Sequence, residues 1–201
     1  MLQYRKYELK TCCWFLFFSL FLSTLATSQR FTAAAFAGIN FSQIDGDQLA
    51  GYHQIGANAG LRVYTYLTDR WELVTGMGFS QLGSNKSVND PQSAALDQVR
   101  LNYVEVPALV SFNEWKFKVS GGLLYSRLIN FKAIDYVGAD VTDLQNWREN
   151  SLSMLVGVSF VPEGSWALDF RWFKAFTDLQ ADSGAAGLLP KNFTLRGLYF
   201  F

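Results

Sequence analysis

The stretch DRWELVTGMGFSQL, residues 69–82, is a short polar turn followed at once by a tryptophan and then by regular alternation. From Trp71 onward one parity is mostly apolar, while the other carries Glu72, two glycines and Ser80. A period of two indicates a β-strand. An apolar face with a tryptophan at its rim, opposite a charged face, is typical of a strand whose outer side touches lipid.

The same turn-then-tryptophan pattern recurs at Asn113-Glu114-Trp115 and Gly164-Ser165-Trp166, each time before another alternating segment. Tryptophan is favoured at a membrane interface, where one end of the ring is apolar and the other wet. The pattern therefore predicts an aromatic girdle at the periplasmic interface. We expect it to comprise four lipid-facing residues: Trp71, Trp115, Trp166 and the terminal Phe201.

Residues 1–28 have the features of a secretory signal peptide. Three basic residues precede an apolar run at 12–25, and Ala26-Thr27-Ser28 matches the small-x-small pattern before a cleavage site. We expect cleavage before Gln29 and a barrel domain over residues 29–201. A retained membrane helix is the alternative, but the run is shorter than the roughly 20 residues that a bilayer requires. Both cysteines, Cys12 and Cys13, lie in this segment, so the mature chain has no thiol chemistry.

The remaining residues divide into eight strand-like segments, and the connections between them alternate strictly between long and short. That alternation is required of an outer-membrane barrel with short periplasmic turns and long extracellular loops. The sequence predicts an all-β fold, an eight-stranded antiparallel up-and-down transmembrane β-barrel in the cell outer membrane, with both termini periplasmic. The expected strands are 31–41, 55–67, 71–82, 99–112, 115–129, 151–161, 166–176 and 191–201.

One strand departs from the pattern. In Leu101-Asn102-Tyr103-Val104-Glu105-Val106-Pro107 the apolar parity changes near Tyr103, which predicts a bulge or a locally apolar interior. Pro107 favours an irregularity because proline cannot donate to the ladder.

Residues 101–110, LNYVEVPALV, resemble the Tyr-x-Glu-hydrophobic-Pro strand of the PorT-like outer-membrane β-barrel family of Bacteroidota. The layout of the whole mature chain is similar to that family, and Phe201 resembles the C-terminal signal read by the barrel assembly machinery. The resemblance implies a role as a subunit or accessory of a larger outer-membrane complex of secretion, gliding or uptake type. Many relatives have no assigned activity, and nothing in the sequence marks it as the founding member.

By parity the interior holds three acidic and five basic residues. An eight-stranded barrel is just wide enough for side chains to fill it, so we expect these charges to pair across it and hold the barrel together. A polar proton or ion path is the alternative, whereas a wide porin channel would require about 16 strands. The interior charges are Arg62, Glu72, Glu105, Lys116, Lys118, Asp169, Arg171 and Arg196.

Signals for catalysis, metals or cofactors are weak. His53 is the only histidine, and Ser42 or Ser80 are its only available partners. We therefore expect no enzyme, no cofactor and no metal, with a lipid-A-modifying barrel enzyme as the alternative. Removing residues 1–28 takes three of 17 basic and one of 17 acidic residues and leaves 14 against 16. That balance gives no basic patch for nucleic acid.

The four long loops carry ten acidic residues against three basic ones. A solvated acidic rim is the simplest interpretation, but loops on a rigid scaffold also concentrate binding function. The 21-residue connection 130–150 is too long for a structureless connector, so we expect it to pack over the barrel mouth or against a partner. Its candidate partner residues are Val141, Leu144 and Trp147. Outer-membrane lipid and lipopolysaccharide are the other expected partners.

Overall fold

The computed structural model describes residues 30–47, 49, 51–87, 96–144, 146–180 and 187–201. The expected signal peptide, residues 1–28, and its cleavage point before Gln29 lie outside this part of the chain, as do parts of the long loops. Within the described residues, no helix is long and apolar enough to cross a membrane.

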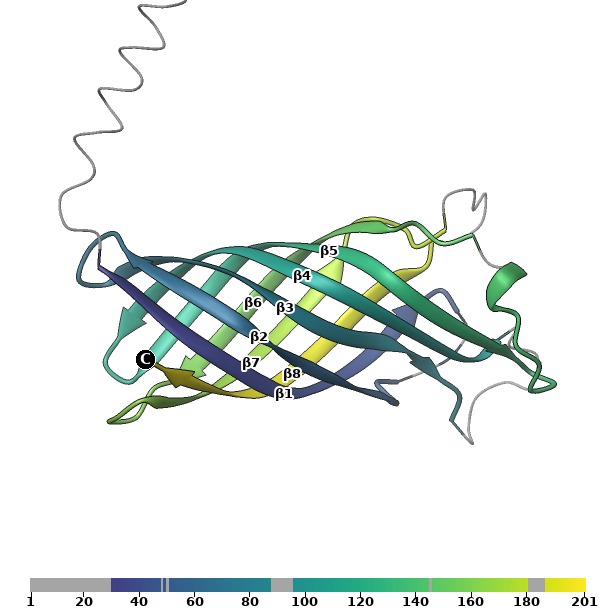
Figure 1. The fold of residues 1–201 in the computed structure, drawn as a ribbon, viewed down its shortest axis with the longest axis horizontal. Helices are drawn as coiled ribbons and strands as arrows, with labels where there is room; N and C mark the ends of the chain where they lie inside the picture. Colours follow the sequence, from purple (N-terminus) through teal and green to yellow (C-terminus); the bar gives the residue numbers. More distant parts are fainter. Residues whose placement is uncertain (1–29, 48, 50, 88–95, 145, 181–186) are drawn as a thin grey trace, which may run out of the picture. The chain divides into compact units, whose positions relative to one another are not determined.

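Residues 31–201 form eight antiparallel strands, each paired with its neighbours in sequence, and β1 closes the ring by pairing with β8 (Figure 1). The predicted fold class is confirmed. A short 3₁₀ helix, η1 (Thr142–Leu144), lies between β5 and β6. The strands are β1 (Phe31–Asp45), β2 (Gln54–Tyr66), β3 (Trp71–Asn85), β4 (Leu96–Glu114), β5 (Phe117–Asp135), β6 (Asn150–Phe160), β7 (Trp166–Ala175) and β8 (Leu189–Phe200).

Short connections gather at one end of the barrel and long ones at the other (Figure 1). The turns after β2, β4 and β6 are the short ones, and Phe201 lies at the same end, where its amide donates to Ala33 O at 3.1 Å. Most strands extend further toward the long loops than the sequence predicts, β5 by six residues and β1 by four, whereas β7 ends one residue earlier than predicted. In β5 the bulge at Ile129 reverses the parity, so that Phe131 and Ala133 face inward, and the alternation that predicts the strand stops at that point.

The alternation predicted from sequence corresponds to an apolar outer face and a polar interior. On β6, the outward Leu152, Met154, Val156 and Val158 are exposed, while the intervening residues, three serines, a leucine and a glycine, point inward and are buried. Backbone groups pair within the closed ring, so the outer face needs no polar side chains to satisfy them. Such a surface is suited to lipid.

The four predicted girdle residues all lie at the short-turn end and are exposed: Trp71, Trp115, Trp166 and Phe201. Neighbouring rings extend the band, since Trp71 lies 4.9 Å from Phe112 and Trp166 lies 4.9 Å from Tyr199 between centroids. The position of Trp115 changes one predicted boundary, because β5 begins at Phe117 and not at residue 115. Trp115 occupies the two-residue turn before β5 with a positive φ of 54°, the left-handed conformation that such tight hairpins use.

The irregularity predicted near Tyr103 lies on the neighbouring strand. Tyr103 pairs with Leu128 and Asn102 pairs with Asn130, so Ile129 of β5 is the bulged residue. Burial on β4 alternates without a break. The change in apolar parity instead reflects a locally apolar interior near the long loops, formed by Leu82, Val99, Leu101, Tyr103 and Leu128.

Candidate functional site

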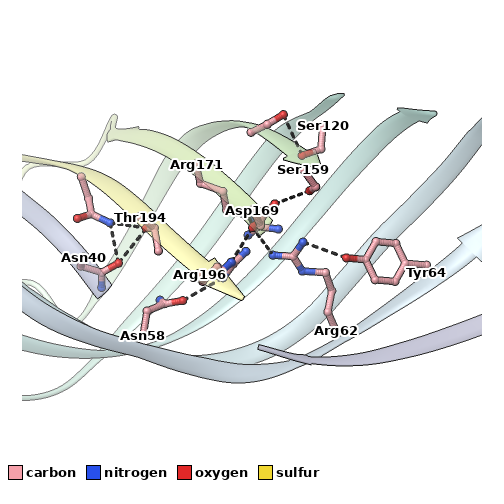
Figure 2. Close-up of polar contacts among 12 residues, drawn as sticks. Asn40, Asn58, Arg62, Tyr64, Ser120, Ser159, Asp169, Arg171, Thr194 and Arg196 are labelled. Carbon is pink, nitrogen blue, oxygen red and sulfur yellow. Dashed lines mark hydrogen bonds and ion pairs between the residues drawn. The ribbon is translucent and has the colours of Figure 1, made fainter. Parts of the chain in front are cut away.

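The barrel interior is organised around Asp169 of β7, which is fully buried. Figure 2 shows three arginine side chains converging on it. Its Oδ2 lies 3.2 Å from Arg62 Nη2, 2.9 Å from Arg171 Nε and 2.6 Å from Arg196 Nε, and Ser159 Oγ donates to its Oδ1 at 2.5 Å. A buried carboxylate is costly without charged partners, so these contacts must form together. They come from β2, β6, β7 and β8 and therefore fix these four strands relative to one another.

The strand register accounts for this convergence. Arg171 follows Asp169 by two positions and therefore shares its face, and Arg196 is its direct cross-strand partner on β8. Arg62 comes from β2, which is not a neighbour of β7 in the ring. Its guanidinium therefore reaches Asp169 across the lumen.

Two of the arginines also form hydrogen bonds with partners other than Asp169. Arg62 Nη1 donates to Tyr64 OH at 3.1 Å, and Arg196 Nη1 donates to Asn58 Oδ1 at 3.0 Å (Figure 2). The Phe36 ring lies beneath, with its centroid 4.2 Å from Arg196 Cζ and 5.5 Å from Arg62 Cζ, which are cation–π distances.

Two glycines make room for Phe36. A Cβ at Gly60 or at Gly78 would lie 2.7 Å from its Cζ atom, closer than carbon atoms approach. Gly60 of β2 and Gly78 of β3 thus give space to the ring that supports the arginine cluster.

A second ion pair lies nearer the short-turn end. Lys118 Nζ lies 3.1 Å from both carboxylate oxygens of the fully buried Glu72, and Asn113 Nδ2 donates to Glu72 Oε2 at 3.0 Å. The same Nζ lies 4.8 Å from the centroid of Tyr64. Tyr64 therefore contacts both the Lys118 and the Arg62 cations and links the two ion pairs.

Two of the eight predicted interior charges behave differently. Lys116 is wrong as an interior residue: it belongs to the turn before β5, and its Nζ lies 3.7 Å from Glu163 Oε1 at the surface. A two-residue turn takes its side chains out of the strand alternation. Glu105 is buried as predicted, yet among the described residues its Oε1 has no hydrogen-bond partner.

Sequence reasoning missed a third polar group, near the middle of β1 and β8. Asn40 Nδ2 donates to Ser80 Oγ at 2.9 Å. Asn40 Oδ1 accepts from Asn192 Nδ2 at 3.0 Å and from Thr194 Oγ1 at 2.8 Å (Figure 2). Each of these residues has inward parity, and that parity was the available signal. Together with the charges, this group fills the lumen with paired polar side chains.

The long connection predicted at 130–150 begins later in the structure, because β5 continues to Asp135. Trp147, a candidate partner residue, is only 7% exposed: its ring lies 5.7 Å from Phe131, and its backbone bridges to Gln180. Trp147 is wrong as a partner residue, because these contacts between segments distant in sequence bury it. Of the other two candidates, Val141 is half-buried and Leu144 is 81% exposed.

Residues 25–180 match the family described as outer membrane protein beta-barrel domain. The chain belongs to this family. It is therefore a small outer-membrane β-barrel, as the lipid-facing alternation predicts. The match establishes this broad family, and the narrower PorT-like resemblance of residues 101–110 stays a prediction.

Two solved members of the same architecture are similar in fold. Ail, the attachment invasion locus protein of Yersinia pestis, solved in complex with the heparin analogue sucrose octasulfate, has a TM-score of 0.51 at 15% identity, covering 87% of this chain and 100% of its own. Neisserial surface protein A has a TM-score of 0.53 at 13% identity with the same coverage. At these identities the likeness extends to the fold alone. No curated protein matches the chain.

The residues considered for catalysis do not come together in this family member. His53 is exposed at the mouth, whereas Ser42 and Ser80 are buried in the interior. Ser42 Oγ donates to Gln54 O at 3.3 Å and accepts from Gly83 N at 2.9 Å, so it is committed to the barrel wall. Within the described ranges, no group of three or more histidine, cysteine or acidic residues could hold a metal ion.

Proposed function

We propose that this outer-membrane barrel is non-enzymatic and binds a protein partner through its extracellular loops, as a subunit or accessory of a larger outer-membrane assembly. The observation that carries the proposal is an exposed apolar tip beyond β5. Tyr136 is 65% exposed, Val137 71% and Leu144 81%. Large apolar side chains exposed in one connection, beyond the end of the strand ladder, mark an interaction surface.

The apolar tip, residues Tyr136, Val137 and Leu144, rests on an ordered base. Asp135 Oδ1 accepts hydrogen bonds from the amides of Val137 at 2.9 Å and Ala139 at 2.8 Å. Trp147 fastens the far end of the same loop to the β7–β8 connection. An ordered tip loses little entropy on binding, which favours affinity.

Asp140 contributes to the same base. Hydrogen bonds from the Thr142 hydroxyl and amide hold the pKa of Asp140 below its ordinary value, and Lys132 Nζ lies 3.7 Å from its Oδ2. The carboxylate therefore stays charged at neutral pH, and the turn that carries the tip keeps its hydrogen bonds.

The chemistry of the loops favours a protein over a polyanion. Ail is described with a heparin analogue, a densely sulfated sugar. The long loops of the present chain hold ten acidic residues against three basic ones, which repel such a ligand. An apolar patch with an acidic rim instead suits a partner with an apolar pocket bordered by basic residues.

The test is copurification in mild detergent from cells that carry an affinity-tagged chain. The triple variant Tyr136→Ser, Val137→Ser, Leu144→Ser removes the apolar tip and leaves its hydrogen-bonded base intact. We expect it to lose the copurifying protein while keeping the heat-modifiable mobility of a folded barrel. The matched control is Leu67→Ser, because Leu67 is 53% exposed at the opposite end.

Two outcomes would overturn the proposal. One is a triple variant that retains every copurifying protein of the wild type. The other is a change in the lipid A profile of cells that carry His53→Ala, because that result would replace the binding role with the lipid-modifying one.

A further inference from the structure

The wall between β5 and β6 opens toward the long loops. Regular pairing ends at Arg127↔Asn150, and the last backbone contact runs from Leu128 N to Glu149 O at 2.7 Å. Beyond this point β5 continues to Asp135, while the chain that leads into β6 turns away. Arg148 N donates to Leu179 O at 2.7 Å, on the β7–β8 connection. The two strands therefore diverge and leave a groove.

Two adjoining pockets occupy this groove. The lower one, of about 500 Å³, is lined by the outward side chains Val104, Val106, Tyr125 and Ile129 and by the charged Arg127 and Glu149. The upper one, of about 340 Å³, shares Leu128, Ile129 and Glu149 with it and continues to Phe131 and Trp147. The bulge at Ile129 shifts the wall at the point where the pockets meet.

The lining of the groove changes from apolar to charged along the barrel. Its lower part continues the lipid-facing surface of β4 and β5. At its upper part, Arg127 Nη2 pairs with Glu149 Oε2 at 3.2 Å, and both side chains are about two-thirds exposed, at 63% and 65%. Arg100 and Lys132, a cross-strand pair on the outer face, lie just beyond.

Basic residues gather at this level around the barrel. The outward side chains near the long-loop ends of the strands include Arg100, Arg127, Lys132, Lys174 and Lys191. Three acidic residues pair with them: Asp45 with Lys174 at 3.3 Å and Lys191 at 2.5 Å, Glu149 with Arg127, and Asp140 with Lys132 at 3.7 Å. The loops above are acidic, so the positive charge is confined to the level between the apolar band and water. Anionic lipid headgroups lie at that level.

We propose that the β5–β6 groove binds one phosphorylated lipid of the outer leaflet. Its acyl chains lie against Val104, Val106 and Tyr125, and its phosphate takes the place of Glu149 on the Arg127 guanidinium. Arginine suits this exchange because its planar fork binds carboxylate and phosphate in the same geometry. This site lies below the apolar tip and is independent of the protein-binding role proposed above.

Native mass spectrometry of the purified, detergent-solubilised barrel tests the proposal, with diphosphoryl lipid A as the probe and the same lipid A with both phosphates removed as the comparator. We expect one diphosphoryl lipid A to bind and the dephosphorylated form to bind at least about tenfold more weakly, the loss associated with a charged hydrogen bond. Arg127→Gln should weaken lipid A binding by about the same factor. Glu149→Gln should tighten it, because the arginine is released.

The chain also offers a matched pair of variants for the apolar part. Val106→Trp fills the lower pocket, whereas Val110→Trp adds the same ring to the same outer face of β4 outside it. We expect only the first to abolish retention of the lipid, with heat-modifiable folding kept in both. Three results would each overturn the proposal. The two lipids bind equally, Arg127→Gln and Glu149→Gln shift the affinity in the same direction, or the Val106→Trp barrel binds lipid A as the wild type does.

Discussion

At the scale of single residues, the charge balance of the interior arginine cluster depends on the carboxylate of Asp169. Asp169 faces three guanidinium groups, and each of the three arginine side chains is at least 95% buried. A buried ion pair adds little when it replaces well-packed apolar groups, but removing one partner strands the other charge in a low-dielectric interior. The main effect of removing the Asp169 charge is therefore to leave three buried guanidinium groups without a counter-charge.

Asp169→Asn keeps the shape of the side chain and removes its charge. We expect the free energy of unfolding to fall by about 3 to 5 kcal/mol, because three buried cations lose their shared counter-charge. Urea titration of the barrel in lipid vesicles measures this change.

The control for that measurement is Glu114→Gln, which breaks the exposed Arg70–Glu114 pair, 3.0 Å long and about 60% exposed on both sides. Its cost should stay below about 1 kcal/mol, since surface ion pairs contribute little. If the two substitutions cost the same, the arginine cluster is not stabilised by Asp169.

At the scale of strands and loops, the outward and inward side chains of one strand are limited by different surroundings. Val156 of β6 is outward and 44% exposed, and its neighbour Gly157 points inward, where a Cβ would lie 3.0 Å from Arg171 Cγ. Lipid excludes charge from the first position, while the Arg171 side chain limits volume at the second.

Val156→Arg places a charge on the lipid face near the middle of β6. We expect a cost of about 2 to 4 kcal/mol in the free energy of unfolding measured in vesicles. Leu144→Arg, on an exposed loop, should stay within about 0.5 kcal/mol of the wild type. A Val156→Arg barrel as stable as the wild type would mean that this face does not contact lipid.

Trp147 fixes the long loop 130–150 to the barrel mouth through Phe131 and the β7–β8 connection. Trp147→Ala should release the loop and leave the strands intact, because the contacts it removes lie outside the ladder. We expect trypsin to cut more rapidly after Arg148, whose amide donates to Leu179 O beside Trp147, with unchanged heat-modifiable mobility. Unchanged cleavage rates would show that the loop is held by other contacts.

At the scale of the whole molecule, the short and long connections give the barrel two different ends. Short turns and aromatic rings lie at one end, and acidic loops with the apolar tip lie at the other. In outer-membrane barrels the short turns face the periplasm. This asymmetry predicts how the chain is oriented in the membrane.

Cysteine labelling of intact cells tests the orientation and the signal peptide together. Cys12 and Cys13 are the only cysteines, so a chain cleaved before Gln29 takes no label. We expect a membrane-impermeant maleimide to label Val137→Cys on intact cells, and to label Glu163→Cys, in a short turn, only after lysis. Labelling of the wild-type chain would contradict cleavage of the signal peptide. Labelling of Glu163→Cys on intact cells would contradict the orientation.

The sequence by itself determined the eight strands, their inward and outward faces, the aromatic rim and the order of short and long connections. These features are local: a period of two and a turn are properties of consecutive residues. For the same reason it identified seven of the eight proposed interior charges by parity and failed at Lys116, where a tight turn interrupts the alternation.

Only the tertiary structure decided which charges meet. Arg62 and Asp169 are 107 residues apart and come from strands that are not neighbours, so their contact depends on closure of the ring. The bulge at Ile129, the burial of Trp147 and the groove between β5 and β6 likewise arise where segments distant in sequence meet. Alternation specifies the face on which a side chain lies, but barrel closure and register determine its partner across the lumen.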